Sequence, residues 1–119
     1  MIRVVIESPF AGRGPTASDR EMDAAENLKY LRACMADCLR RGEAPFASHG
    51  LYTQPGVLRD DVPEERAMGI SAGFAWRAVA ELTVFYVDRG WSNGMRLAAE
   101  HCTASGARYE ERSLPEVPS

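Results

Sequence analysis

The stretch TVFYVDRGWSNGMRLAA, from Thr83 to Ala99, decides the expected fold. Its first residues are nearly all apolar or aromatic, which predicts a strand that is buried on both faces, as in a parallel sheet. Ser92 follows a short turn and is a good N-cap, so a helix is expected to begin there. Free backbone N–H groups at a helix start attract anions, and Gly94 lets a ligand approach the backbone. The stretch therefore predicts a ligand site at this turn.

The rest of the chain repeats the alternation of strand and helix. Such alternation predicts an α/β fold with a small open parallel sheet of about four strands, flanked by helices. With the strand order 2-1-3-4, the ligand crevice lies beyond the carboxyl ends of the first and third strands. Residues 1–112 are expected to form a single domain, and residues 113–119 a loose tail. Strands are expected at 2–7, 44–48, 82–88 and 108–112, and helices at about 22–41, 61–79 and 92–105.

Composition narrows the classes of partner. The net charge of -3 argues against a nucleic-acid polymer, which is held through excess Lys and Arg. No apolar run approaches the ~20 residues of a membrane helix, and the chain enters a strand at once without a signal-peptide core. Three cysteines are too few for a disulfide framework. We therefore expect a cytoplasmic protein that contacts neither nucleic acid nor membrane.

Cys34 and Cys38 lie four residues apart on one helix face, so they could hold half of a metal site with His49 or His101. Nothing supplies a second close pair of ligands, however, and free cysteines are commonly buried. The interpretation as core thiols is favoured, and neither a metal nor a cofactor is predicted.

The long segment from His49 to Glu65 carries several apolar residues with no obvious internal position, among them Leu51 and Val57. Exposed patches of this kind usually mark an interface, so a homo-oligomer is predicted. Asp61 and Glu64 have the spacing of a capping box for the next helix. The buried face of that helix is predicted to contain Met68, Ala72, Ala75 and Val79.

Four segments resemble one known family. They are IESPFAG at 6–12, ASHGLYTQPGVL at 47–58, PEERAMGISAGFAW at 63–76, and the S-x-G turn at 92–94. The first and last of these, with the arrangement of three helices, resemble the nucleoside 2-deoxyribosyltransferase superfamily. The two middle segments look typical of its short, little-characterised members often met in bacteriophage genomes. The resemblance covers nearly the whole chain. It implies a flavodoxin-like, deoxyribosyltransferase-like fold and a nucleoside or nucleotide as the small-molecule partner.

The resemblance also implies a set of binding residues. In the enzymes of this superfamily, the loop after the first strand and the S-x-G turn hold the sugar or phosphate end of the ligand. His49 stands beside the predicted crevice, where it could be catalytic or touch a phosphate, although a hydrogen-bonded structural histidine is favoured. Tyr52 could stack on a base or anchor its loop by packing. The predicted ligand-binding residues are Ser8, Pro9, Phe10, Gly12, His49, Tyr52, Asp88, Ser92, Gly94 and Met95.

One position departs from the enzymes. They carry a catalytic glutamate four residues after the glycine of the S-x-G turn, where this chain has Ala98. Glu100 cannot replace it, because two residues along a helix correspond to about 200° of rotation. Glu7 and Asp61 are the candidate catalytic residues, with Asp60 and Asp88 as further carboxylates near the crevice.

Three functions therefore stay open. The first is binding of a nucleoside, nucleotide or nucleotide-derived signal without turnover. The second is an N-glycosidase or deoxyribosyltransferase reaction that uses a relocated carboxylate. The third is a protein-interaction module in which the site is vestigial.

Overall fold

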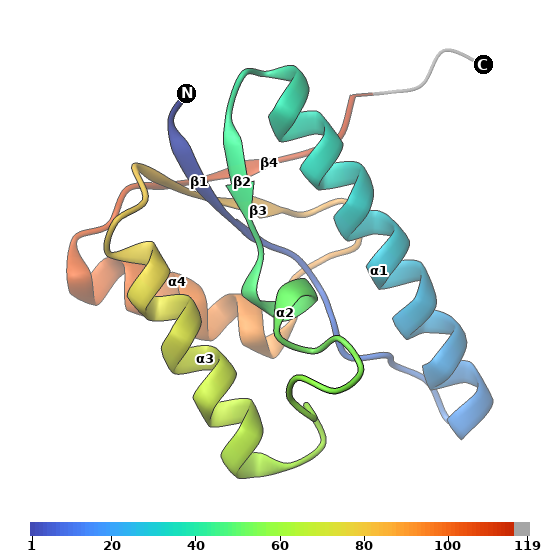
Figure 1. Cartoon of the computed structure of the whole chain (residues 1–119). Coiled ribbons are helices and arrows are strands. Elements are labelled where there is room, and N and C mark those ends of the chain that lie inside the picture. Colours follow the sequence, from blue (N-terminus) through green and yellow to red (C-terminus); the bar gives the residue numbers. More distant parts are fainter. Residues whose placement is uncertain (116–119) are drawn as a thin grey trace.

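The computed structural model describes residues 1–115 and shows an α/β fold with one four-stranded sheet, flanked by helices (Figure 1). All pairings are parallel and the strand order is β2-β1-β3-β4, so the predicted fold class and strand order are confirmed. The strands are β1 (Arg3–Glu7), β2 (Ala44–Phe46), β3 (Leu82–Tyr86) and β4 (Tyr109–Arg112). The helices are α1 (Ala17–Arg40), α2 (Ser48–Leu51), α3 (Pro63–Arg77) and α4 (Asn93–Ser105).

The helices cover the two faces of the sheet unequally. Alternate residues of β1 and β3 point to opposite faces, as the two-residue period of a strand requires. On one face, Ile6 and Tyr86 pack with Leu31 and Cys34 of α1. On the other face, Phe85 packs against α4, while Thr83 accepts a hydrogen bond from Arg77 of α3. The long helix α1 thus covers one face alone, and α3 and α4 share the other (Figure 1).

Two helix starts differ from the sequence predictions. Helix α1 begins at Ala17, earlier than predicted, because the Thr16 side chain accepts a hydrogen bond from the backbone N–H of Asp19. Helix α3 begins at Pro63 with Val62 as its N-cap, so the predicted capping role of Asp61 is wrong. A proline in the first turn needs no partner for its missing N–H, which lets this helix start without a side-chain cap.

The predicted buried face of α3 is also wrong. Met68 is 61% and Val79 49% exposed, whereas Gly73 and Arg77 are the buried residues of the helix. A Cβ on Gly73 would lie 2.7 Å from Ser48 Oγ, so α3 and α2 are in close contact along this glycine. The helix therefore turns its small and cationic residues toward the sheet, where Arg77 finds a carboxylate partner.

Two further predictions concern cysteines and chain ends. Cys34 and Cys38 are buried free thiols, as predicted.

No group of three or more potential metal ligands occurs within residues 1–115. None of the helices in this part of the chain is long and apolar enough to cross a membrane. In the predicted tail, Leu114 packs against the core and its N–H donates to the Asp88 carboxylate at 3.0 Å, while 116–119 lie outside the described residues.

Candidate functional site

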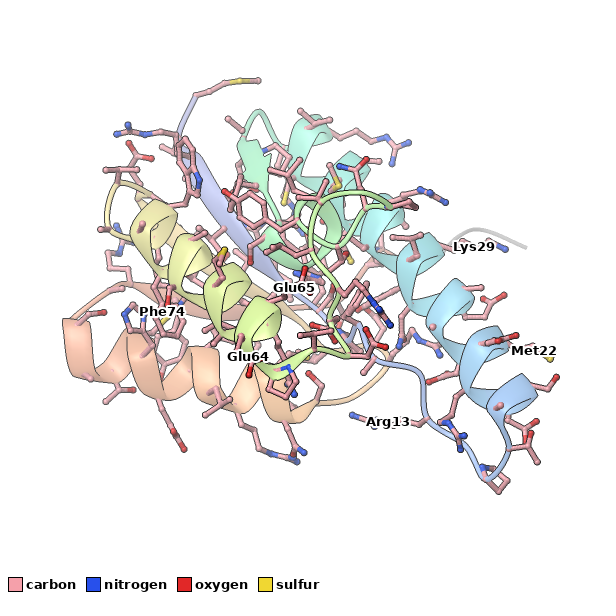
Figure 2. All side chains as sticks on the ribbon, turned by 60° about the horizontal axis from the view of Figure 1, so that its bottom comes forward. Arg13, Met22, Lys29, Glu64, Glu65 and Phe74 are labelled. Atoms are coloured by element: carbon pink, nitrogen blue, oxygen red, sulfur yellow. The ribbon has the colours of Figure 1, made fainter. Side chains whose placement is uncertain are left out.

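A cavity of about 580 Å³ opens where the carboxyl ends of β1 and β3 meet the helices α3 and α4. Parallel sheets of this order place ligands at this position, because the crossovers on either side of the first strand leave a crevice there. Figure 2 shows Arg13 reaching from the loop before α1 and Phe74 lying between α3 and α4. Both residues line the cavity.

The cavity gathers most of the residues predicted from the sequence. Segments far apart in the chain meet there: the end of β1 with its following loop, the start of α2, and the turn into α4. The predicted residues that line it are Glu7, Ser8, Phe10, Gly12, His49, Ser92, Gly94 and Met95.

Four predicted site residues lie elsewhere. Tyr52 accepts a hydrogen bond from Trp76 Nε1 at 2.8 Å, so it anchors its loop to α3. Asp61 is exposed and pairs with Arg59 at 2.8 Å. Asp88 faces α1 and the tail, where it bonds to the Tyr30 hydroxyl and to Leu114. Pro9 is buried next to the lining residues without joining them.

An ion pair forms one wall of the cavity. The Arg77 side chain is only 2% exposed, and its Nη2 donates to Glu7 Oε1. Its Nε donates to Thr83 Oγ1 at 3.2 Å, and its Nη1 lies 2.9 Å from His101 Nδ1. Because a guanidinium can only donate, Nδ1 of His101 is the acceptor and carries no proton. Phe74 stacks on the His101 ring with centroids 3.7 Å apart, which fixes the whole group.

The titration of these groups is shifted by their surroundings. Burial raises the pKa of Glu7 to about 7, although Arg77 opposes the shift. The pKa of His101 is lowered by burial and by the adjacent Arg77 cation. Near neutral pH, Glu7 is therefore a carboxyl group that can hold or release a proton.

Ser8 and His49 form a second polar pair in the cavity. Ser8 Oγ lies 2.8 Å from His49 Nε2, and the Phe10 ring meets the imidazole edge-on. Burial lowers the pKa of His49 to about 4, so its ring is neutral at pH 7. The structural and the ligand-binding interpretations of His49 are compatible here, because the residue is hydrogen-bonded and also lines the cavity.

The turn into α4 is open toward the cavity. Ser92 Oγ accepts a hydrogen bond from the Met95 N–H at 3.1 Å, as an N-cap should. Among residues 1–115, a Cβ on Gly94 would meet only Ser92 Oγ, at 3.8 Å, so none of them fills the space in front of this backbone. Ala98 lies one turn further along α4 and also lines the cavity. Its methyl group can neither attack a sugar nor carry charge.

Several lining residues were not predicted. They come mainly from α3, at spacings that place them on one helix face. The sequence does contain a signal for them, because they recur at helical spacing. This face of the helix is less hydrophobic than the face with Met68 and Val79, so the hydrophobic pattern favours the wrong face. The unpredicted lining residues include Arg13, Arg66, Ile70, Phe74, Arg77 and Arg96.

Fold and cavity together define a parallel α/β domain with a small-molecule-sized site at the carboxyl ends of its strands. Residues 2–112 match the family model described as a domain of unknown function, DUF7768, and the chain belongs to this family. No match was found among curated proteins or among solved structures.

Proposed function

We propose that the chain binds a nucleoside, nucleotide or nucleotide-derived signal in this cavity, without turnover. The observation that carries the proposal is the meeting of two distant segments, Ser8–Gly12 and Ser92–Gly94, in one cavity. These are the segments through which the sequence resembles the nucleoside 2-deoxyribosyltransferase superfamily, and we infer a distant relationship to it. A volume of about 580 Å³ suits a ligand of this size.

The absence of turnover is inferred from the side chains at the expected reaction centre. Ala98 occupies the position of the catalytic glutamate in the enzymes that the sequence resembles. Glu7 is also a glutamate and lines the cavity, but its carboxylate forms an ion pair with the buried guanidinium of Arg77. A glycosidic bond in this cavity would therefore meet a methyl group where the enzymes have their nucleophile, and Glu7 is held by Arg77.

A second candidate function is hydrolysis or transfer at an N-glycosidic bond. It is favoured by one observation, namely that Glu7 and Asp60 line the same cavity. Glycosidases commonly use two carboxyl groups on opposite sides of the scissile bond. Asp60 would then have the catalytic role that the sequence predicts for its neighbour Asp61.

We further propose a cytoplasmic location and assembly into a homo-oligomer. Leu51, Val57 and Met68 are exposed apolar residues, with exposures of 45%, 51% and 61%. Association of chains would cover such surface. A role in sequestering or sensing a nucleotide, as in a bacteriophage protein, fits binding without turnover.

The test is calorimetric titration with a panel of nucleosides and nucleotides, followed by chromatography of the same mixtures. Binding without release of free base is expected. Release of base would favour the glycosidase, and absence of binding across the panel would favour a protein-interaction module.

A matched pair of variants locates the binding site. Gly94→Val places a branched side chain in the open space at the α4 turn and should abolish binding of any ligand found. Ala104→Val makes a comparable change on an exposed part of the same helix and should leave affinity unchanged. Circular dichroism of both variants is the control for folding. A folded Gly94→Val protein with wild-type affinity would remove the turn from the site.

A further inference from the structure

The cavity is more positively charged than the chain that contains it. The chain has a net charge of -3, yet among residues 1–115 four arginines line the cavity against two carboxylates, Glu7 and Asp60. Arg77 and Glu7 neutralise each other as a buried pair. The remaining lining arginines are Arg13, Arg66 and Arg96, and Asp60 is the remaining carboxylate. Three positive charges less one negative charge leave a net charge of about +2 around the opening.

These three arginines are available to a ligand. Within the described part of the chain, none of them forms an ion pair. Arg13 donates one hydrogen bond from Nη2 to the carbonyl of Trp91 at 3.1 Å, and Arg96 Nη1 lies 3.4 Å from Asn93 Oδ1. Each guanidinium has five N–H donors, so most donors of all three stay free.

The arginines come from three separate segments of the structure. Arg13 lies in the loop before α1, Arg66 in the first turns of α3, and Arg96 in the first turns of α4. Each arginine fork pairs best with two acceptor sites at once. Because a phosphate oxygen accepts more than one hydrogen bond, a single phosphate can satisfy three forks, but only where the forks converge on one point. These three forks stand on separate segments around the opening, which favours an acceptor that extends over more than one phosphate group.

We infer that the ligand carries at least two phosphate groups, as in a nucleoside diphosphate, a triphosphate or a pyrophosphate-linked nucleotide. This inference rests on the proposed nucleotide site and names the class of ligand within it. Asp60 is the only carboxylate of the cavity that no arginine in residues 1–115 neutralises, and it opposes the binding of anions.

The experiment compares ligands that differ only in phosphate number. Wild-type protein is titrated calorimetrically with each common nucleoside and with its mono-, di- and triphosphate, and with inorganic phosphate and pyrophosphate. For the base that binds best, affinity should rise about tenfold or more from mono- to diphosphate. The diphosphate affinity should also fall steeply as salt is raised from 50 to 300 mM.

Variants that remove a positive or a negative charge from the cavity should change the affinity for a diphosphate in opposite directions. Arg66→Gln and Arg96→Gln should each weaken diphosphate binding by about tenfold, because each removes a charge-assisted bidentate contact. Asp60→Asn should strengthen it several-fold. Arg40→Gln, on an exposed arginine at the end of α1 outside the cavity, should change nothing. The substituted side chains are exposed or at the cavity rim, and the salt dependence of wild type gives an independent measurement if any variant unfolds.

The outcomes separate this inference from the proposed function. Equal affinities for mono- and diphosphates, or unchanged affinities in both arginine variants, would overturn the inference and leave nucleotide binding intact. Pyrophosphate binding that no nucleoside moiety improves would support the arginine assignment and overturn the nucleotide function. Failure of every nucleotide and of pyrophosphate to bind would overturn both.

Discussion

His49 and Glu7 are expected to contribute to stability with opposite signs as the pH falls. The pKa of His49 is about 4 in the folded protein and about 6.5 in an unfolded chain. Between these values the unfolded chain binds more protons, so stability is lost as the pH falls below 6.5. At ~1.4 kcal/mol per unit, the loss between pH 6.5 and 5 is about 2 kcal/mol.

Glu7 acts in the other direction. Its pKa is about 7 in the folded protein, against 4.5 for an ordinary glutamate. The folded state then binds more protons than the unfolded state within this window, so stability rises as the pH falls from 7 toward 4.5. Between pH 7 and 5 the gain is also about 2 kcal/mol. The two contributions nearly cancel in the wild type.

Two variants separate these contributions. Urea unfolding of wild type, His49→Gln and Glu7→Gln is followed by circular dichroism at pH 7 and at pH 5. Relative to wild type, His49→Gln should gain about 2 kcal/mol on going to pH 5, and Glu7→Gln should lose about as much. The pKa of Asp37 is set by burial, Tyr86 and nearby arginines that all three proteins keep, so its contribution cancels in the comparison. Parallel pH dependences in the three proteins would refute the assigned pKa shifts.

Three further predictions concern packing, chemistry and assembly. Gly12→Ala should destabilise the fold by about 1–3 kcal/mol or more in urea unfolding, because the new Cβ would lie 1.7 Å from the Arg20 carbonyl oxygen; Gly94→Ala should cause no loss. Wild type should release no base from deoxynucleosides or deoxynucleotides in a chromatographic assay, because Ala98 offers no nucleophile; steady release that survives Ala98→Val would contradict this. Light scattering at tens of micromolar should show at least a dimer, and a monomeric mass would contradict the predicted assembly.

Much of the fold could be predicted from local sequence patterns. The apolar runs in β1 and β3 indicate strands covered on both faces, and the structure buries them between α1 on one side and α3 and α4 on the other. Ser92 and Gly106 mark the ends of α4, as an N-cap and a left-handed C-cap. These signals lie within a few residues of the features that they specify. A sequence therefore reports them without tertiary information.

The orientation of α3 could not be predicted in the same way. Its hydrophobic periodicity favours the side with Met68 and Val79, but the structure exposes that side. The decisive interaction is the contact of Arg77 with Glu7, a residue 70 positions away. A buried cation is stable only with a partner of opposite charge, and this partner lies on β1, which approaches α3 only in the folded structure. For the same reason the residues that β1 and α4 contribute to the site could be predicted from the sequence, whereas those of α3 could not.

The ion pair between Arg77 and Glu7 also limits which chemistry the cavity could support. A nucleophilic carboxylate must be free to approach a sugar carbon, and moving Glu7 away would leave a buried guanidinium without its partner, at a cost of about 3–5 kcal/mol. A general acid, by contrast, needs a proton near neutral pH, and burial raises the pKa of Glu7 to about 7. If the cavity cleaves a glycosidic bond at all, Glu7 therefore suits the acid and Asp60 is left to activate water or to stabilise the cationic sugar. Both Glu7→Gln and Asp60→Asn would then abolish base release, whereas Asp61→Asn, on an exposed residue paired with Arg59, would leave it unchanged.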